Sequence, residues 1–496
     1  MKTQFVSTGA ITVALSLLLG TPFVHADQPK LAEPSAEQLA FADMELGAFY
    51  HFGMSTFTGE VHGLGRGKPS AFNPARLDTR QWLSGAVGLR AKYATLTARH
   101  EDGFCLWPTD TTDYSVKNAP WKHGKGDVVG DFVAACREVG IAPCLYYSPA
   151  FDAHHLFKAT DKPRWGEWNI PKYWDRMSKE EFAAFKEREL AQVTELLRRY
   201  RPAYIWCDHN LAGAPSAPRM QELMRAVTSR IMELDPKCLV HGPHTWGTGS
   251  ERGSVVYPLW NAVNTVDGTL LTRPRVTRKN TNATSEFGLL ETGVNTGHPF
   301  GRFWRPRESV TDRPFGSGRW FWNDNSIRGV QSGEQLVDEF YYRTVGFGAN
   351  LMINFAPNKS GLVPDVQIIN ARAFGEALAK RFAKPVGQTA DVSVGDTVTV
   401  SWEKPSAVRE VVLMENIVHG QKVASYQLEA WVNNSWQALI PRNAPGFRSR
   451  KPAGYETIGH KKIDRVAPVT TTKVRFRCLK AVAKPVEIRS MKVFGE

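Results

Sequence analysis

The sequence predicts an α/β protein with a (β/α)8 barrel-like domain followed by a C-terminal all-β sandwich domain. Between residues 47 and 357, short apolar segments alternate with amphipathic stretches, which favours a parallel sheet covered by helices. About eight such units, with long connections after the strands, suit a closed barrel better than an open sheet. After residue 385, short alternating runs divided by Gly, Asn and Pro predict the sandwich. We therefore expect the barrel over residues 27–380 and the sandwich over residues 385–496.

The expected elements follow in chain order. Apolar runs predict barrel strands at residues 47–53, 93–100, 142–149, 203–208, 238–243 and 349–357. Amphipathic stretches predict helices at 77–87, 128–139, 179–199, 220–234 and 335–344, and a last helix at 368–380 leads into the second domain. The first strand is not followed by GxGxxG, which argues against a dinucleotide-binding fold.

The first 26 residues have the pattern of a secretory signal peptide. Lys2 precedes an apolar run from Ala10 to Leu19, and Val24-His25-Ala26 suits cleavage by a signal peptidase. The run is short for a membrane anchor. We therefore expect an exported protein, periplasmic or secreted, with no membrane span after the signal peptide is removed.

Composition narrows the class of partner. The chain has 62 Lys and Arg against 49 Asp and Glu, a net charge of +13 without a basic tail. This charge could attract an anionic polysaccharide, but a soluble basic surface explains it as well, and we expect no nucleic-acid partner outside the cytoplasm. The six cysteines form no CxxC pair, which predicts buried free thiols in preference to a zinc site or a disulfide framework. The sequence predicts no oligomeric state.

Polar side chains stand where three of the predicted barrel strands end. His51 lies near the end of the first, His100 and Glu101 stand at the end of the second, and Asp208 ends the strand AYIWCD. The carboxyl ends of barrel strands converge on one face, so these groups are expected to meet in one pocket. Each also has a structural interpretation, as a hydrogen-bonded histidine or as an Asp that caps the next helix.

Tryptophans are frequent in this chain, which has fifteen of them. Trp304, Trp320 and Trp322 lie in one segment that also carries Glu308. Aromatic faces stack on sugar rings while carboxylates and imidazoles bind hydroxyls, although core packing explains single tryptophans equally well. A retaining glycosidase needs two carboxyl groups about 5 Å apart, and Asp208 and Glu308 are the candidates.

Several motifs together resemble one enzyme family. Six segments resemble motifs that the α-L-fucosidases of glycoside hydrolase family 29 carry in the same order. In chain order they are GAFYHFG, FNPARLDTRQW, TARHEDGFCLWPT, AYIWCD, WRPRESVTDRP and VGFGANLMINFAPNKSGLVP. The matches cover about residues 40–365. The C-terminal segment EVVLMENIVHGQKVASYQLEAW also resembles the sandwich of the subgroup that prefers branched α-1,3 and α-1,4 linkages.

The resemblance implies a fold, an activity and a set of site residues. It implies hydrolysis of terminal α-L-fucosyl linkages in oligosaccharides or polysaccharides, with net retention and without a metal or organic cofactor. Asp208 would be the nucleophile and Glu308 the general acid/base, with Glu286 and Glu291 as alternatives because this region of the family varies. The sugar subsite would be lined by His51, His100, Tyr147, Trp206 and Trp320.

Two departures from the family pattern bear on the sugar that is accepted. The family has a second His where this chain has Glu101, and it has Glu-Trp where this chain has Val61-His62, with Glu60 shifted by one position. An ionised Glu only accepts hydrogen bonds, and loss of the Trp removes a stacking face. Glu101 and His62 are thus expected in the sugar subsite. Three alternatives follow. The two residues could replace the lost family contacts in an ordinary fucosidase, they could adapt the pocket to a related sugar such as L-galactose, or the protein could bind sugar without catalysis.

Overall fold

A computed structural model describes residues 30–162, 171–208, 218–241, 253–263, 265–266, 269–270, 297–312, 320–324, 327, 331–442 and 455–495. The chain divides into two units, Met1–Lys30 and Leu31–Glu496, and the second unit carries the fold described below. The predicted signal peptide lies outside the described residues. Within the described ranges, every helix is too short or too polar to cross a bilayer.

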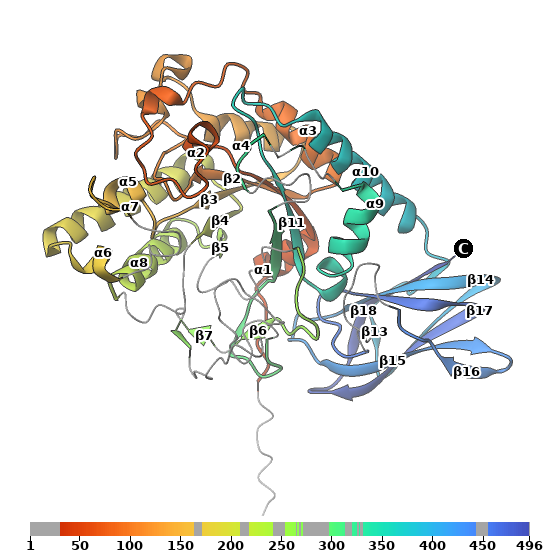
Figure 1. Ribbon diagram of the computed structural model, residues 1–496. Helices are drawn as coiled ribbons and strands as arrows, with labels where there is room; N and C mark the ends of the chain where they lie inside the picture. The colour runs from red at the N-terminus through yellow and green to blue at the C-terminus, as the bar shows by residue number, and fades with distance from the viewer. Residues whose placement is uncertain are drawn as a thin grey trace, which may run out of the picture. The chain divides into compact units, whose positions relative to one another are not determined.

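A parallel sheet forms the centre of the first domain (Figure 1). Its strand order is β10-β11-β1-β2-β3-β4-β5, and all neighbouring pairs are parallel. The six predicted strands are found within a few residues, and β10 was not predicted. The bounds are β1 (Leu46–Tyr50), β2 (Tyr93–Arg99), β3 (Ala142–Tyr147), β4 (Tyr204–Cys207), β5 (Leu239–His241), β10 (Glu308–Thr311) and β11 (Asn350–Phe355). With the antiparallel domain described below, this sheet confirms the predicted fold class.

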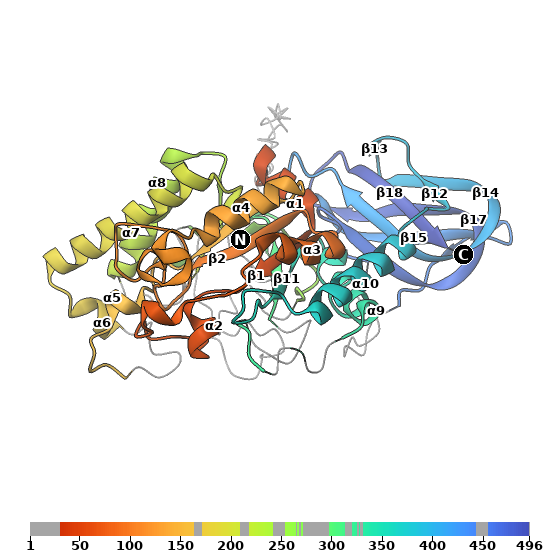
Figure 2. The same cartoon turned by 90° about the horizontal axis from the view of Figure 1, so that it is seen from above.

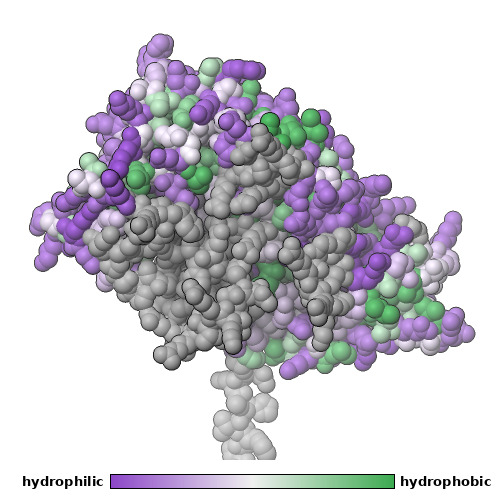
Figure 3. All heavy atoms as spheres, viewed as in Figure 1, coloured by the Kyte–Doolittle hydropathy of each residue, from purple (hydrophilic) through white to green (hydrophobic). Residues whose placement is uncertain are grey.

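Helices cover the outside of this sheet, as Figure 2 shows from above. The side chains of Asp78, Asp127 and Ser178 accept backbone N–H bonds at the first turns of α3, α4 and α7, which explains where these helices begin. The outward faces of α7 and its neighbours are hydrophilic (Figure 3), as expected for helices with one buried face. The long helices are α3 (Thr79–Leu89), α4 (Val128–Glu138), α7 (Lys179–Tyr200), α8 (Pro218–Leu234) and α10 (Asp365–Arg381).

Shorter elements join these. The helix predicted at 335–344 is instead the short helix α9 (Gly333–Leu336) continued by a π-helical turn, Val337–Tyr341, because an extra residue is accommodated in that turn. The other short elements are α2 (Met54–Thr58), α5 (Ala153–Leu156), α6 (Pro171–Asp175), β6 (Ala262–Val263), β7 (Thr265–Val266), β8 (Thr269–Leu270) and β9 (Phe303–Trp304).

The interior of the barrel is packed with aromatic side chains. Helix α1 (Ala36–Met44) places Phe41 against Tyr93 and Tyr204, with ring centroids 5.2 and 5.1 Å apart. Tyr93 and Tyr204 are the first residues of β2 and β4, so α1 packs at the amino ends of the strands. The opposite, carboxyl ends are therefore the side on which the interior can open to a ligand.

The second domain is an antiparallel sheet in the order β12-β18-β14-β17-β15-β16, with β13 also paired to β18. Bulges between Ser401 and Ser406 and between Val408 and Glu410 interrupt the pairing of β14 with β17; bulges of this kind bend long strands around a core. Its bounds are β12 (Gly387–Gln388), β13 (Ser393–Val394), β14 (Thr397–Glu415), β15 (Val423–Val432), β16 (Ser435–Ala438), β17 (Lys462–Ala481) and β18 (Glu487–Gly495).

Polar contacts join the segment before β17 to the barrel domain. Lys461 Nζ lies 2.7 Å from both carboxylate oxygens of Glu45, and His460 Nε2 lies 2.8 Å from Asp43 Oδ1. Burial disfavours the charged Asp43, but hydrogen bonds from His460 and Arg489 outweigh it and lower the pKa of Asp43 to about 2. The contacts thus join the domains through buried or half-buried ion pairs.

The cysteines are free, as predicted. Cys105, Cys136, Cys144, Cys207 and Cys238 are buried, and burial raises the pKa of each thiol. They therefore pack as small apolar side chains.

Candidate active site

Asp208 stands directly after Cys207, the last residue of β4. Its side chain is half-buried, and the hydroxyl of Tyr146 donates a hydrogen bond to its Oδ2. Its backbone N–H donates to the carbonyl of Tyr147, 3.2 Å away, which extends the pairing of β3 with β4. The strand pairing fixes the backbone of Asp208, and the Tyr146 hydroxyl orients its carboxylate, as a nucleophile requires.

Tyr146 connects Asp208 to two other predicted site residues. Its ring stacks on His100 with centroids 5.3 Å apart and an interplanar angle of 17°. The same ring also stacks on Trp206, at 5.5 Å and 19°. Asp208, His100 and Trp206, which the sequence placed in one pocket, are thus brought together by a tyrosine that sequence reasoning missed.

His51 completes the polar side of the site. Its Nδ1 lies 2.8 Å from Asn354 Oδ1, and Asn354 Nδ2 donates to the carbonyl of Trp320 at 2.8 Å. This orients the amide so that its oxygen accepts from Nδ1–H, which leaves Nε2 of His51 as the acceptor nitrogen. Burial, with repulsion from nearby His100, lowers the pKa of His51 well below its usual value. His51 is therefore neutral, and its Nε2 is suited to accept a hydrogen bond from a sugar hydroxyl.

Aromatic rings surround these polar groups. Trp320 lies 4.7 Å from His51 and 6.3 Å from Phe49, measured between ring centroids. Phe321 meets His100 edge-on at 4.8 Å. Rings beside hydroxyl-binding groups are the composition of a sugar pocket.

Glu101 and His62 form a pair next to His100. His62 Nδ1 lies 2.7 Å from Glu101 Oε2, and the two side chains are 26% and 6% exposed. Beside them, Asp102 accepts a hydrogen bond from Ser55 Oγ at 3.1 Å, and burial raises the pKa of Asp102 to about 6. The two residues that depart from the family pattern therefore contact each other.

Glu308 lies deeper in the barrel than Asp208. It is the first residue of β10 and pairs with Asn350, the first residue of β11. Its Oε1 accepts from Tyr93 at 2.5 Å and from Tyr204 at 3.5 Å, the residues on which α1 packs. Glu308 thus belongs to the amino end of the interior, whereas Asp208 stands past the carboxyl end of β4.

Trp206 lies between these two levels. Its Nε1 donates to Glu308 Oε2 at 3.0 Å, and Glu308 is only 1% exposed. Burial raises the pKa of Glu308 to about 7, although hydrogen bonds from Tyr93, Trp206 and Tyr204 oppose the rise. The assignment of Glu308 as acid/base stays a prediction that these contacts do not favour; Glu286 and Glu291 lie outside the described residues.

Tyr147 does not face this site, contrary to the sequence prediction. Its hydroxyl donates to Glu189 Oε2 at 2.6 Å and to Gln192 Oε1 at 3.0 Å, both on helix α7, and the residue is fully buried. Successive residues of a strand point to opposite faces, so Tyr146 takes the interior position and Tyr147 packs outward.

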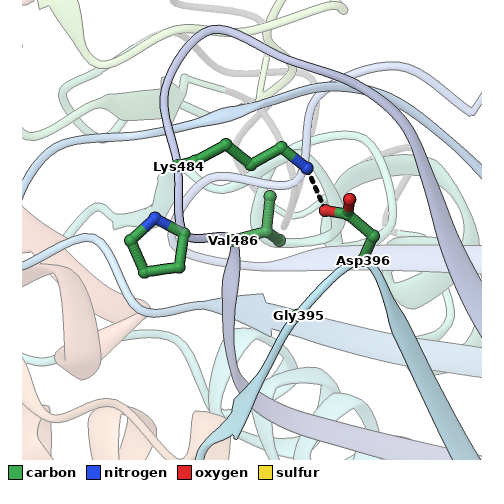
Figure 4. A pocket seen from close by; sticks show the side chains of 5 residues that line it. Gly395, Asp396, Lys484 and Val486 are labelled. Atoms are coloured by element: carbon green, nitrogen blue, oxygen red, sulfur yellow. Dashed lines mark hydrogen bonds and ion pairs between the residues drawn. The ribbon is translucent and has the colours of Figure 1, made fainter.

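The geometry also limits which other groups could act. Among the described residues, no group of three or more His, Cys, Asp and Glu side chains could hold a metal ion. A pocket on the sandwich domain, shown in Figure 4, is lined by Gly395, Asp396, Lys484, Pro485 and Val486. It holds an Asp396–Lys484 ion pair and no aromatic ring, so it lacks the composition of the barrel site.

A strand-end carboxylate, the neutral imidazole of His51 and aromatic walls at the carboxyl ends of barrel strands are the composition of a glycoside hydrolase site. The family model of α-L-fucosidase matches residues 67–381. The chain belongs to the α-L-fucosidase family, glycoside hydrolase family 29, and is a glycoside hydrolase with α-L-fucosidase activity.

Individual relatives agree with this assignment. Putative α-L-fucosidase 1 of Oryza sativa subsp. japonica is 29% identical over 492 residues, covering 88% of this chain and 85% of the relative. The crystal structure of a putative α-L-fucosidase from Bacteroides thetaiotaomicron is 26% identical with a TM-score of 0.74, covering 94% of this chain and all of that chain. A glycoside hydrolase 29 family member from an unknown rumen bacterium is 29% identical with a TM-score of 0.73, covering 94% and 78%.

Proposed function

We propose that the protein is an exported exo-glycosidase that releases terminal α-L-fucosyl residues from glycans with net retention. The observation that supports this most directly is Asp208, fixed by Tyr146 at the strand end beside His100 and the aromatic rings. The glycan is an oligosaccharide or polysaccharide with a terminal L-fucose. No metal or organic cofactor is needed, because two carboxyl groups suffice for the chemistry.

The reaction proceeds in two displacements. In the first, an oxygen of Asp208 attacks the anomeric carbon, the glycosidic bond breaks, and the leaving oxygen takes a proton from the acid/base. In the second, the acid/base removes a proton from water, the water oxygen attacks the anomeric carbon, and the ester to Asp208 breaks. Two inversions give net retention.

The sugar itself is held by groups that read its hydroxyls and its apolar face. His51 and His100 bind hydroxyls, and Trp206 and Trp320 contact the apolar parts of the ring. The remaining polar contact comes from the Glu101–His62 pair. We propose that this pair compensates for the altered family positions in a fucose pocket; the second candidate is a pocket for L-galactose, which has one hydroxyl more than L-fucose.

Export rests on the sequence of the first 26 residues, which we propose are removed as a signal peptide to give a periplasmic or secreted enzyme. Mass spectrometry of the N-terminus of protein from the culture medium and the periplasm tests this. A mature N-terminus near Asp27 is expected, and an intact Met1 on all of the protein would contradict it.

Hydrolysis of matched aryl α-L-fucoside and α-L-galactoside tests the activity. Faster release from the fucoside, lost in Asp208→Asn, is expected. Faster release from the galactoside would assign the retuned pocket and make Glu101 and His62 the next residues to mutate. Hydrolysis that survives in Asp208→Asn would contradict the role of Asp208.

A further inference from the structure

Glu308 is a buried carboxyl, and three side chains among the described residues donate hydrogen bonds to it. Tyr93 and Tyr204 donate to one of its oxygens, and Trp206 donates to the other. All three donors belong to strands β2 and β4 of the barrel interior. Such a carboxyl fixes the rings that surround it, since each ring loses a hydrogen bond if it turns away.

The fixed ring that matters for chemistry is Trp206. Its indole is 7% exposed and is held at one edge by Glu308, while its face packs on Tyr146. Tyr146 in turn donates to Asp208. A continuous chain of contacts therefore runs from Glu308 through the indole and the phenol to the carboxylate that attacks the sugar.

The same contacts argue against proton transfer by Glu308 to a leaving oxygen. A retaining acid/base lies about 5 Å from the nucleophile and reaches the glycosidic oxygen directly. Glu308 instead has both oxygens occupied by donors from the barrel interior, at the level where helix α1 packs.

We propose that Glu308 is a positioning residue that sets the orientation of Trp206, and through Tyr146 that of Asp208, and that the acid/base is a different carboxyl. This inference rests on the proposed function, because it assigns a role within the same active site. It makes Glu308 a determinant of the rate, although Glu308 itself does not touch the sugar.

Substrates with different leaving groups distinguish positioning from acid catalysis. The variants are Glu308→Gln, which keeps the shape of the side chain, and Trp206→Phe, which removes the Nε1–H and leaves the carboxyl. Each is assayed on 4-nitrophenyl α-L-fucoside, which needs little acid assistance, and on methyl α-L-fucoside, which needs it. Glu415→Gln is the matched control, because Glu415 is also 1% exposed with a pKa raised by burial to about 7, but lies in the sandwich.

We expect Glu308→Gln to lower kcat about tenfold on both fucosides, the effect of one lost buried hydrogen bond, with no recovery in azide. Trp206→Phe should lower both rates by a similar factor, and the double variant should lose little more, because both changes remove the same bond. Glu415→Gln should leave both rates unchanged.

Two results would overturn the proposal. A loss confined to the methyl fucoside, with azide producing fucosyl azide from the aryl fucoside, would make Glu308 the acid/base. An unchanged kcat in both variants would make the contact merely structural. If Glu308→Gln does not fold, Trp206→Phe decides by kcat at saturating fucoside, because loss of its contact with the sugar would appear in KM. A wild-type enzyme inactive on both fucosides would instead contradict the proposed function.

Discussion

The Glu101–His62 pair allows a quantitative test, because both members depart from the family pattern and contact each other. The change is Glu101→Gln, which keeps the size of the side chain and removes its charge. The hydrogen bond is short, 2.7 Å, and Glu101 is 6% exposed while His62 is 26% exposed. A hydrogen bond to a charged group contributes about 1.5–3 kcal/mol, and partial exposure of His62 places this pair near the lower end.

We therefore expect Glu101→Gln to lower kcat/KM on aryl α-L-fucoside by about tenfold, since about 1.4 kcal/mol corresponds to a factor of ten. The assay compares the wild type, Glu101→Gln, His62→Ala and the double variant. If the pair acts as a unit, the double variant loses no more than the larger single loss. Additive losses, or losses below twofold in each variant, would refute the reasoning.

Three further outcomes follow from the structure. Tyr146→Phe should lower kcat/KM about tenfold, because it removes the hydroxyl that donates to Asp208. Tyr147→Phe should leave kcat/KM within about threefold and lower Tm, and equal losses of kcat/KM in the two variants would contradict this. Burial raises the pKa of Glu415 from 4.5 to about 7, so the folded state keeps a proton that the unfolded chain releases, and stability falls as pH rises from 4.5 to 7. Glu415→Gln should therefore make Tm less dependent on pH over that range, and an unchanged slope of Tm against pH would contradict this. Lys461→Met should lower the free energy of unfolding in urea by about 2 kcal/mol, because it leaves Glu45 without its cation. The double variant with Glu45→Gln should recover part of this stability, and additive losses of the two single variants would contradict the reasoning.

Much of the barrel was predictable because its strands are buried on both faces and separated by long amphipathic helices. His51, His100 and Asp208 could be placed for the same reason: each directly follows a strand, and the carboxyl ends of barrel strands meet. No knowledge of side-chain direction was needed for these three.

The errors came where side-chain direction or depth decides. In a strand that is apolar on both faces, consecutive tyrosines carry no alternation, so the sequence could not tell Tyr146 from Tyr147. Strand β10 reads ESVT, four residues with one large apolar side chain, and its pairing with β11 depends on distant residues. The level of Glu308 within the barrel was therefore invisible in the sequence.

We propose that Asp208 is the nucleophile of a retaining α-L-fucosidase. The most direct test is to incubate the purified enzyme with 2-deoxy-2-fluoro-α-L-fucosyl fluoride and to map the covalent adduct by mass spectrometry of peptides. We expect inactivation with one deoxyfluorofucosyl group on Asp208. A label on another carboxyl, or inactivation of Asp208→Asn with the same stoichiometry, would contradict the assignment.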